Sequence, residues 1–208
     1  MAPVVDLGPA SGWAGAGATV LVVITTSLVA LGFFDRFKAP RLVLSFRAEE
    51  PWCRSGRLAD GRAAWWVRIG VTNTGKSVAY GCVGRLTGAA TADAERDDVD
   101  PVQLRWAGLP RSRAFAPVDI RPGQREYLNV LLLPDGEDWH LVTFEDPDFD
   151  PGFTTELEAA LPHELRIAVF SSNAATEVAS LVTSPAAPGS PATVRMTGGS
   201  DAGRASVR

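Results

Sequence analysis

An uncharged run of 22 residues, from Trp13 to Phe34, constrains this chain more than any other feature of its sequence. A helix needs about 20 apolar residues to cross the hydrocarbon core of a bilayer, because each residue adds only about 1.5 Å along the axis. Soluble domains rarely contain such a run, so a buried core helix is the weaker interpretation. Trp13 at one end, and Phe33 and Phe34 at the other, lie where interfacial aromatic residues are expected. The run predicts a transmembrane helix over residues 13–34, after a short segment, residues 1–12.

A cleaved signal peptide is the alternative interpretation of the same run. No basic residue precedes the run, the run is too long, and Ala30-Leu31-Gly32 is a poor small-x-small cleavage site. We therefore expect the helix to be retained as a membrane anchor.

The charges that flank the run predict its orientation. Only Asp6 is charged before Trp13, whereas the other flank is basic and carries Arg36, Lys38, Arg41 and Arg47. Basic flanks stay on the cytoplasmic side of a membrane. We expect a single-pass protein of the cell (inner) membrane, with a juxtamembrane linker over residues 35–40 and its carboxyl-terminal domain in the cytoplasm.

Small residues at the start of the predicted helix are compatible with self-association. Gly12 and Ala16 have the small-xxx-small spacing that lets two membrane helices approach closely. This spacing suggests a homodimer through the helix. Ala and Gly are also common in membrane spans without any partner, and the sequence leaves both interpretations open.

From residue 41 to residue 183 the sequence changes to short runs of period two, separated by turn residues, which is the pattern of β-strands. Between Trp65 and Asn73 every second side chain is apolar, and this face is predicted to be buried. A turn is expected next, because Gly75 can take a positive φ and the Asn73 side chain can bond to nearby backbone. The following strand, 79–87, is predicted to bury one apolar side: Tyr80, Cys82 and Leu86.

Further strands bring the expected number to eight or nine. They are expected at residues 41–46, 102–106, 116–120, 126–133, 141–144, 164–171 and 177–183. This number suits an all-β, antiparallel β-sandwich over residues 41–183, which is long enough to bury a core without a metal or disulfide. One or two helical turns are expected over residues 154–161. Residues 184–208 are rich in Pro, Ala, Gly, Ser and Thr and are predicted to form a disordered tail.

Two short segments resemble a known family. The segment Val71-Thr-Asn73-Thr-Gly75-Lys-Ser-Val-Ala79 resembles the second and third strands of bacterial immunoglobulin-like modules, including the CARDB-like family. The segment Asp119-Ile-Arg-Pro122-Gly123 resembles the edge of such sandwiches. The resemblance, over about residues 65–87, implies an immunoglobulin-like scaffold for adhesion or protein binding, mostly found outside the cell. The chain departs from antibody-type domains, because the spacing of Cys53 and Cys82 does not indicate an inter-sheet bridge.

The sequence contains no arrangement that predicts catalysis or a cofactor. His140 and His163 have no ligand-spaced neighbour, and a buried, hydrophobe-like Cys82 is favoured over a Cys–His nucleophilic pair. An acidic stretch begins like an EF-hand calcium loop. Counted from Asp146, however, position six is Pro151 rather than Gly, and position twelve is Leu157 rather than Glu. We interpret it as an acidic interaction loop that comprises Glu145, Asp146, Asp148 and Asp150. We expect no enzymatic activity, no cofactor and no metal site.

Charge is distributed unevenly along the chain. Residues 36–125 hold 16 basic and 9 acidic side chains, whereas residues 126–165 hold 11 acidic and no basic ones. The formal net charge of −4 argues against a nucleic-acid-binding protein. The basic and acidic side chains can form ion pairs across strands, or one of the two groups can form a binding surface. The sequence does not decide between these arrangements.

These features predict a membrane-anchored, non-catalytic protein-interaction module whose partners are the lipid bilayer and an unidentified protein. Two alternatives remain open. One is a membrane-tethered sensor or effector subunit, whose β-domain binds a ligand and whose helix self-associates. The other is an exported, adhesion-type immunoglobulin-like module.

Overall fold

The computed structural model describes residues 38–58, 60–91, 94–96, 102–134, 138–142, 156–158, 160–185, 192–198 and 204–207. The chain divides into two compact units, Met1–Ala39 and Pro40–Arg208, and all strands belong to the second unit. The predicted transmembrane helix, residues 13–34, lies outside the described residues. Among the residues that are described, no helix has the length and hydropathy needed to cross a membrane.

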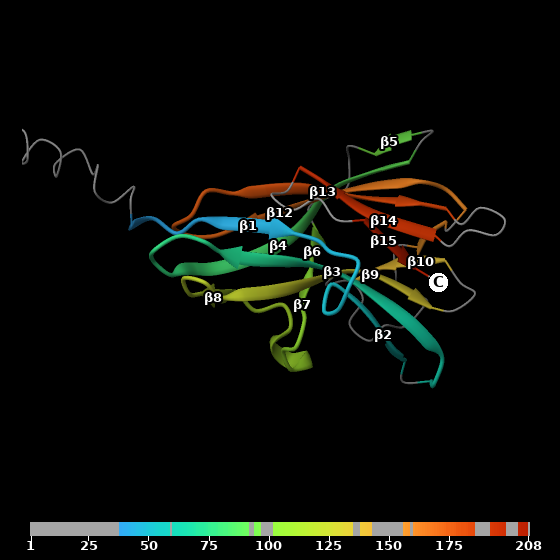
Figure 1. Ribbon diagram of the computed structural model, residues 1–208, viewed down its shortest axis with the longest axis horizontal. Coiled ribbons are helices and arrows are strands. Elements are labelled where there is room, and N and C mark those ends of the chain that lie inside the picture. Colours follow the sequence, from blue (N-terminus) through green and yellow to red (C-terminus); the bar gives the residue numbers. More distant parts are fainter. Residues whose placement is uncertain are drawn as a thin grey trace, which may run out of the picture. The chain divides into compact units, whose positions relative to one another are not determined.

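The described strands form two antiparallel sheets (Figure 1). Sheet 1 has the order β1-β3-β9-β10-β11, and in addition β2 pairs with β3 and β7 pairs with β9. Its strands are β1 (Leu42–Ser45), β2 (Cys53–Arg57), β3 (Ala63–Asn73), β7 (Arg105–Trp106), β9 (Arg125–Pro134), β10 (Trp139–Leu141) and β11 (Glu156–Leu157).

Sheet 2 has the order β15-β14-β13-β12-β4-β5, and β6 and β8 also pair with β4. Its strands are β4 (Ala79–Thr91), β5 (Ala94–Arg96), β6 (Val102–Gln103), β8 (Val118–Ile120), β12 (His163–Phe170), β13 (Glu177–Ser184), β14 (Ala192–Thr197) and β15 (Arg204–Val207). A short 3-10 helix, η1 (Arg111–Arg113), lies between β7 and β8.

The core lies between the two sheets. One cluster of buried apolar side chains contains Val67, Ile69 and Val71 from β3 together with Leu165 and Ile167 from β12. The face of β3 that the alternation marks as internal is therefore the internal one. The prediction of an all-β, antiparallel sandwich is confirmed for the part of the chain that the structure describes.

The Asn73 side chain ties together the segments that meet at one end of the sandwich. Its Oδ1 accepts hydrogen bonds from the N–H groups of Arg41 (3.1 Å) and Gly75 (2.9 Å). Its Nδ2 donates to the carbonyl oxygens of Ser77 and Ile120, both at 2.8 Å. The amide is fully buried, and these four bonds use its two donors and two acceptor lone pairs. The predicted turn is thus also a junction between β1, β3 and β8.

One side chain expected inside the sandwich lies outside it. Tyr80 was predicted to share the buried side of its strand with Cys82, but it is 51% exposed, whereas Cys82 is buried. The reason is a bulge between Ala79 and Cys82, in which Gly81 has a φ of +59°. One extra residue in a strand turns the side chains before it to the other face.

Two expectations about the carboxyl-terminal half are wrong. Residues 184–208 do not form a disordered tail throughout, because they supply β14 and β15 and bury Val194 and Met196 in the core. Polar and apolar residues alternate over Thr193-Val-Arg-Met196, and this segment pairs with β13 and so extends sheet 2. The segment predicted to hold helical turns, 154–161, instead contains β11.

Replacing Asn73 by Asp should destabilise the fold strongly. The change leaves the carbonyl oxygens of Ser77 and Ile120 without donors and buries a carboxyl group beside them, at a cost on the order of 3 kcal/mol. Because burial raises the pKa of a carboxyl group, the deficit relative to wild type should shrink as the pH falls. Urea denaturation of the full chain in detergent measures both effects.

Asn173→Asp is the matched control for this prediction. The Asn173 amide makes comparable bonds, accepting from Tyr80 N–H and donating to the Val78 carbonyl oxygen, but it is exposed. Its replacement should cost less than about 1 kcal/mol. Equal losses for the two variants would contradict the role of Asn73 as a buried junction.

Candidate binding surface

Most residues that the sequence marks as sites lie outside the described residues. Lys38 and Arg41 are the two predicted site residues that the structure describes. Both are exposed, and the backbone N–H of Arg41 is held by Asn73. Those outside are Gly12, Trp13, Ala16, Phe33, Phe34, Arg36, Glu145, Asp146, Asp148 and Asp150. Among the described residues, no group of three or more His, Cys, Asp or Glu side chains could hold a metal ion.

The cysteines and histidines considered for chemistry have separate surroundings. Cys53 and Cys82 are both free and buried. Burial raises the pKa of the Cys53 thiol to about 11 and also raises the pKa of Cys82. The Cys53 Sγ lies 3.8 Å from the Arg47 carbonyl oxygen, and the His163 Nε2 lies 2.8 Å from that of Glu158. The side chains of Cys53 and His163 are thus both in contact with backbone carbonyl oxygens.

A different cluster appears on the outer face of sheet 1, where the edge of the sheet is interrupted. β1 pairs with the second half of β3 and β2 with the first half, so residues 46–52 bulge out between them. The bulge contains a cis peptide bond before Pro51, and the N–H groups of Trp52 and Cys53 both donate to the Glu49 carbonyl oxygen. The chain rejoins β3 where the Arg68 N–H donates to the Trp52 carbonyl oxygen, at 2.7 Å. This bulge places Trp52 over the outer face of the sheet.

The Trp52 indole is fixed against a glycine. Its Nε1 donates to the Ser45 carbonyl oxygen at 3.2 Å, and a Cβ on Gly70 would lie only 2.9 Å from that Nε1. Tyr127 meets the indole edge-on, with the ring centroids 5.6 Å apart. The absence of a side chain at position 70 is therefore what lets the ring lie on the sheet.

Two arginines contact this ring. The guanidinium carbons of Arg47 and Arg125 lie 5.2 Å and 5.1 Å from the ring centroid of Trp52. These are cation–π distances. Arg125 Nε also donates to Thr72 Oγ1 at 2.7 Å, and Arg47 forms an ion pair with Glu49 at 3.5 Å. The ring and these bonds orient both cations on the outer face.

Two further arginines continue the cluster along the sheet. Arg68 is half-buried and donates from Nε to Asn129 Oδ1 at 2.8 Å. Burial, followed by the positive charge of nearby Arg54, lowers the pKa of Arg68. A guanidinium still keeps its proton at neutral pH. We call the set Arg47, Trp52, Arg54, Arg68, Arg125 and Tyr127 the arginine–tryptophan surface.

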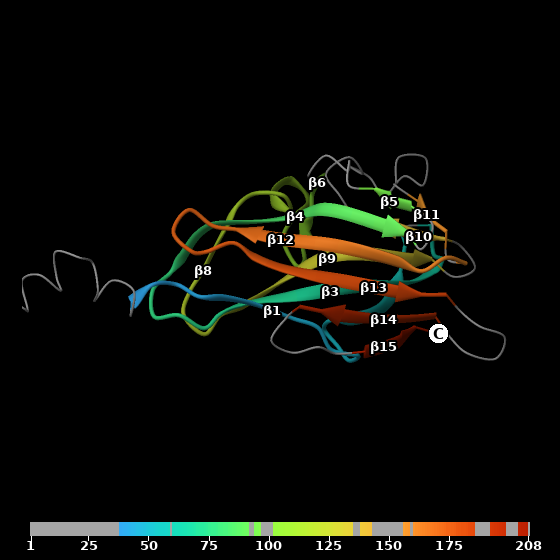
Figure 2. The same cartoon turned by 90° about the horizontal axis from the view of Figure 1, so that it is seen from above.

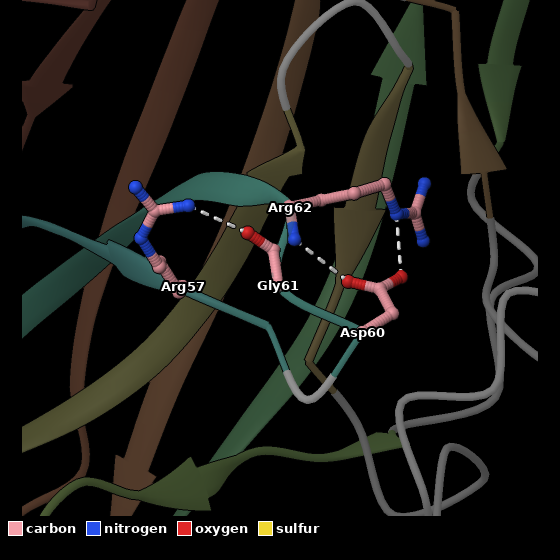
Figure 3. Close-up of polar contacts among 4 residues, drawn as sticks. All are labelled: Arg57, Asp60, Gly61 and Arg62. Atoms are coloured by element: carbon pink, nitrogen blue, oxygen red, sulfur yellow. Dashed lines mark hydrogen bonds and ion pairs between the residues drawn. The ribbon is translucent and has the colours of Figure 1, made fainter.

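The hairpin between β2 and β3 holds two more arginines, but these serve its own turn (Figure 3). Arg57 donates to the Gly61 carbonyl oxygen at 2.9 Å. Asp60 accepts from the N–H and the Nε of Arg62, at 3.0 Å and 2.5 Å. These bonds lower the pKa of Asp60. The hairpin arginines therefore stabilise a turn, and we do not include them in the surface.

The composition of the arginine–tryptophan surface suits the binding of an anion. A guanidinium presents planar pairs of N–H donors that match a carboxylate or a phosphate. Four arginines stand here against two acidic neighbours, Glu49 and Glu50, which leaves a positive surplus. Sequence reasoning missed the surface because its members come from three strands and a bulge. The alternation in β3, which places Arg68 on the external face, was the one local indication.

Comparison with protein-family models, with curated proteins and with solved structures finds no match to this chain.

Gly70→Ala should destabilise the fold by about 1–3 kcal/mol, the usual cost of overpacking. The added Cβ would approach both Trp52 Nε1 and Ser45 Oγ at 2.9 Å, so the indole must shift. In a Trp52→Phe background the same change should cost less, because the two positions are in contact. Urea denaturation of the four proteins gives this coupling energy.

Gly88→Ala controls for the loss of a strand glycine. A Cβ at position 88 would meet only the Arg166 Cβ, at an ordinary 3.6 Å. If Gly70→Ala cost no more than Gly88→Ala, the indole would not be held against position 70.

Proposed function

We propose that this chain is a single-pass, membrane-anchored, non-catalytic protein-interaction module. Its β-sandwich, of immunoglobulin-like type, lies in the cytoplasm and binds an acidic segment of a partner protein. The anchor is the uncharged run of residues 13–34, and its basic flank supports the cytoplasmic side.

The arginine–tryptophan surface is the observation that carries the binding proposal. Arg54 and Arg125 are exposed, while Trp52 is buried and holds Arg125 in place. Arginines held in position lose less conformational freedom on binding than mobile ones, and carboxylates are their planar partners. Arg, Trp and Tyr are also the residue types that dominate protein interfaces.

The binding proposal can be tested with a defined probe. A fluorescein-labelled peptide of about ten residues, rich in Glu and Asp, should bind the full chain in detergent and raise its fluorescence anisotropy. The affinity should fall with added salt, because exposed charges are screened. Arg54→Gln combined with Arg125→Gln should weaken binding by about tenfold or more, as expected for lost charge-assisted hydrogen bonds.

The controls use the other sheet and an uncharged peptide. Arg85→Gln combined with Arg195→Gln removes two exposed arginines from sheet 2 and should leave the affinity unchanged. The peptide with Gln and Asn in place of its acidic residues should not bind. Equal weakening by both double variants would show attraction to net charge alone and would overturn the proposal.

A further inference from the structure

The large apolar side chains that stay exposed in the described part of the chain all lie in sheet 2 or at its bulge. They are Tyr80, Phe170 and Val178, with exposed fractions of 51%, 39% and 47%. Phe170 pairs with Val83 of β4, and Val178 pairs with Ala168 of β12. Phe170 and Ala168 are two residues apart on one strand, so they share a face with Val178. Phe170 and Val178 thus lie on the outer face of sheet 2, and the Tyr80 side chain, at the bulge, is also exposed; we call these three side chains the apolar patch.

This patch lies at the end of the sandwich where β1 begins, which we call the β1 end. The Ser172 N–H donates to the Tyr80 carbonyl oxygen at 3.0 Å, which joins the loop after β12 to the start of β4. The start of β4 is joined in turn to Arg41 through the Asn73 side chain. Figure 2 shows the start of β1 at the same end as β8 and the turn between β12 and β13.

Exposed basic side chains gather at the same end. They are Arg41 before β1, Lys76 in the turn before β4 and Arg121 after β8. Three acidic side chains also lie here. Asp119 accepts a hydrogen bond from the Gly81 N–H, Glu126 accepts one from Gln124, and Glu177 is half-buried. Arg41, Lys76 and Arg121 are exposed, whereas Asp119 is the one exposed side chain among these three acidic residues.

The chain between the predicted anchor and β1 limits where this end can lie. Only seven residues, 35–41, separate Phe34 from Leu42, and fully extended they span at most about 25 Å. If the anchor spans the membrane, the β1 end stays within that distance of the bilayer surface. Aromatic and basic side chains are the groups that favour an anionic membrane interface.

We propose that the β1 end docks on the anionic lipid surface, with Tyr80, Phe170 and Val178 in the headgroup region and Arg41, Lys76 and Arg121 beside lipid phosphates. This inference rests on the anchor of the proposed function but is independent of the acidic partner. Docking would hold the sandwich at a fixed inclination to the membrane.

A fluorescent label at each end of β12 tests the docking. The full chain carries a nitrobenzoxadiazole group at Ala175→Cys, in the exposed loop of the β1 end, or at Ala160→Cys, exposed at the opposite end. The native thiols are buried, so the introduced one takes the label. In vesicles of phosphatidylcholine and phosphatidylglycerol with a headgroup nitroxide, we expect strong quenching at 175 and little at 160. Quenching at 175 should be weaker in phosphatidylcholine alone.

Substitutions then assign the quenching to the patch. Tyr80→Ser combined with Phe170→Ser should reduce the quenching at 175 at least twofold. Val182→Ser, on the same face of β13 but at its other end, should not. Equal quenching at 175 and 160 would overturn the proposal, as would a signal at 175 that depends on the protein-to-lipid ratio, because the latter indicates a second copy.

Flotation of the same samples separates the two proposals. A chain that does not float with the vesicles lacks the anchor, and the proposed function itself fails. A chain that floats but shows no quenching at 175 has an anchor without docking, and only the present inference fails.

Discussion

The described fold depends on one buried amide, the side chain of Asn73. Its four hydrogen bonds join the backbone before β1, the turn after β3 and the end of β8. An unpaired polar group in this position would cost free energy, whereas a fully bonded one makes the junction specific. These bonds hold three segments together at the end of the sandwich where β1 begins.

The two outer faces have different chemistry because the bulges in them have different causes. In sheet 1 the interruption between β1 and β2 places Trp52 against Gly70, and Arg47 and Arg125 lie over its ring. In sheet 2 the extra residue at Gly81 turns Tyr80 out of the core. The alternation of strands only provides an inside and an outside. The irregular positions decide which side chains the outside presents.

Regular strands could be predicted from the sequence, and irregular ones could not. The alternation of Val67, Ile69 and Val71 fixes the internal face of β3, and the Asn73-Thr-Gly75 turn follows from local chemistry. β2 was missed because Cys-Arg-Ser-Gly-Arg carries no apolar period, since only Cys53 faces the core. β14 was not predicted because its alternation of polar and apolar residues covers only four positions, Thr193 to Met196. The residues around them are rich in Pro, Gly and Ala, which is a composition typical of disorder. The arginine–tryptophan surface depends on contacts between distant segments, which local patterns do not encode.

We propose that a membrane anchor holds the sandwich on the cytoplasmic side of the membrane. The most direct measurement labels intact cells with a membrane-impermeant maleimide, using the full chain with Arg195→Cys, an exposed position on β14. Cys53 and Cys82 are buried and contribute little background. The account predicts labelling only after the membrane is permeabilised, with the chain in the membrane fraction. Labelling of intact cells would place the sandwich outside and contradict the account.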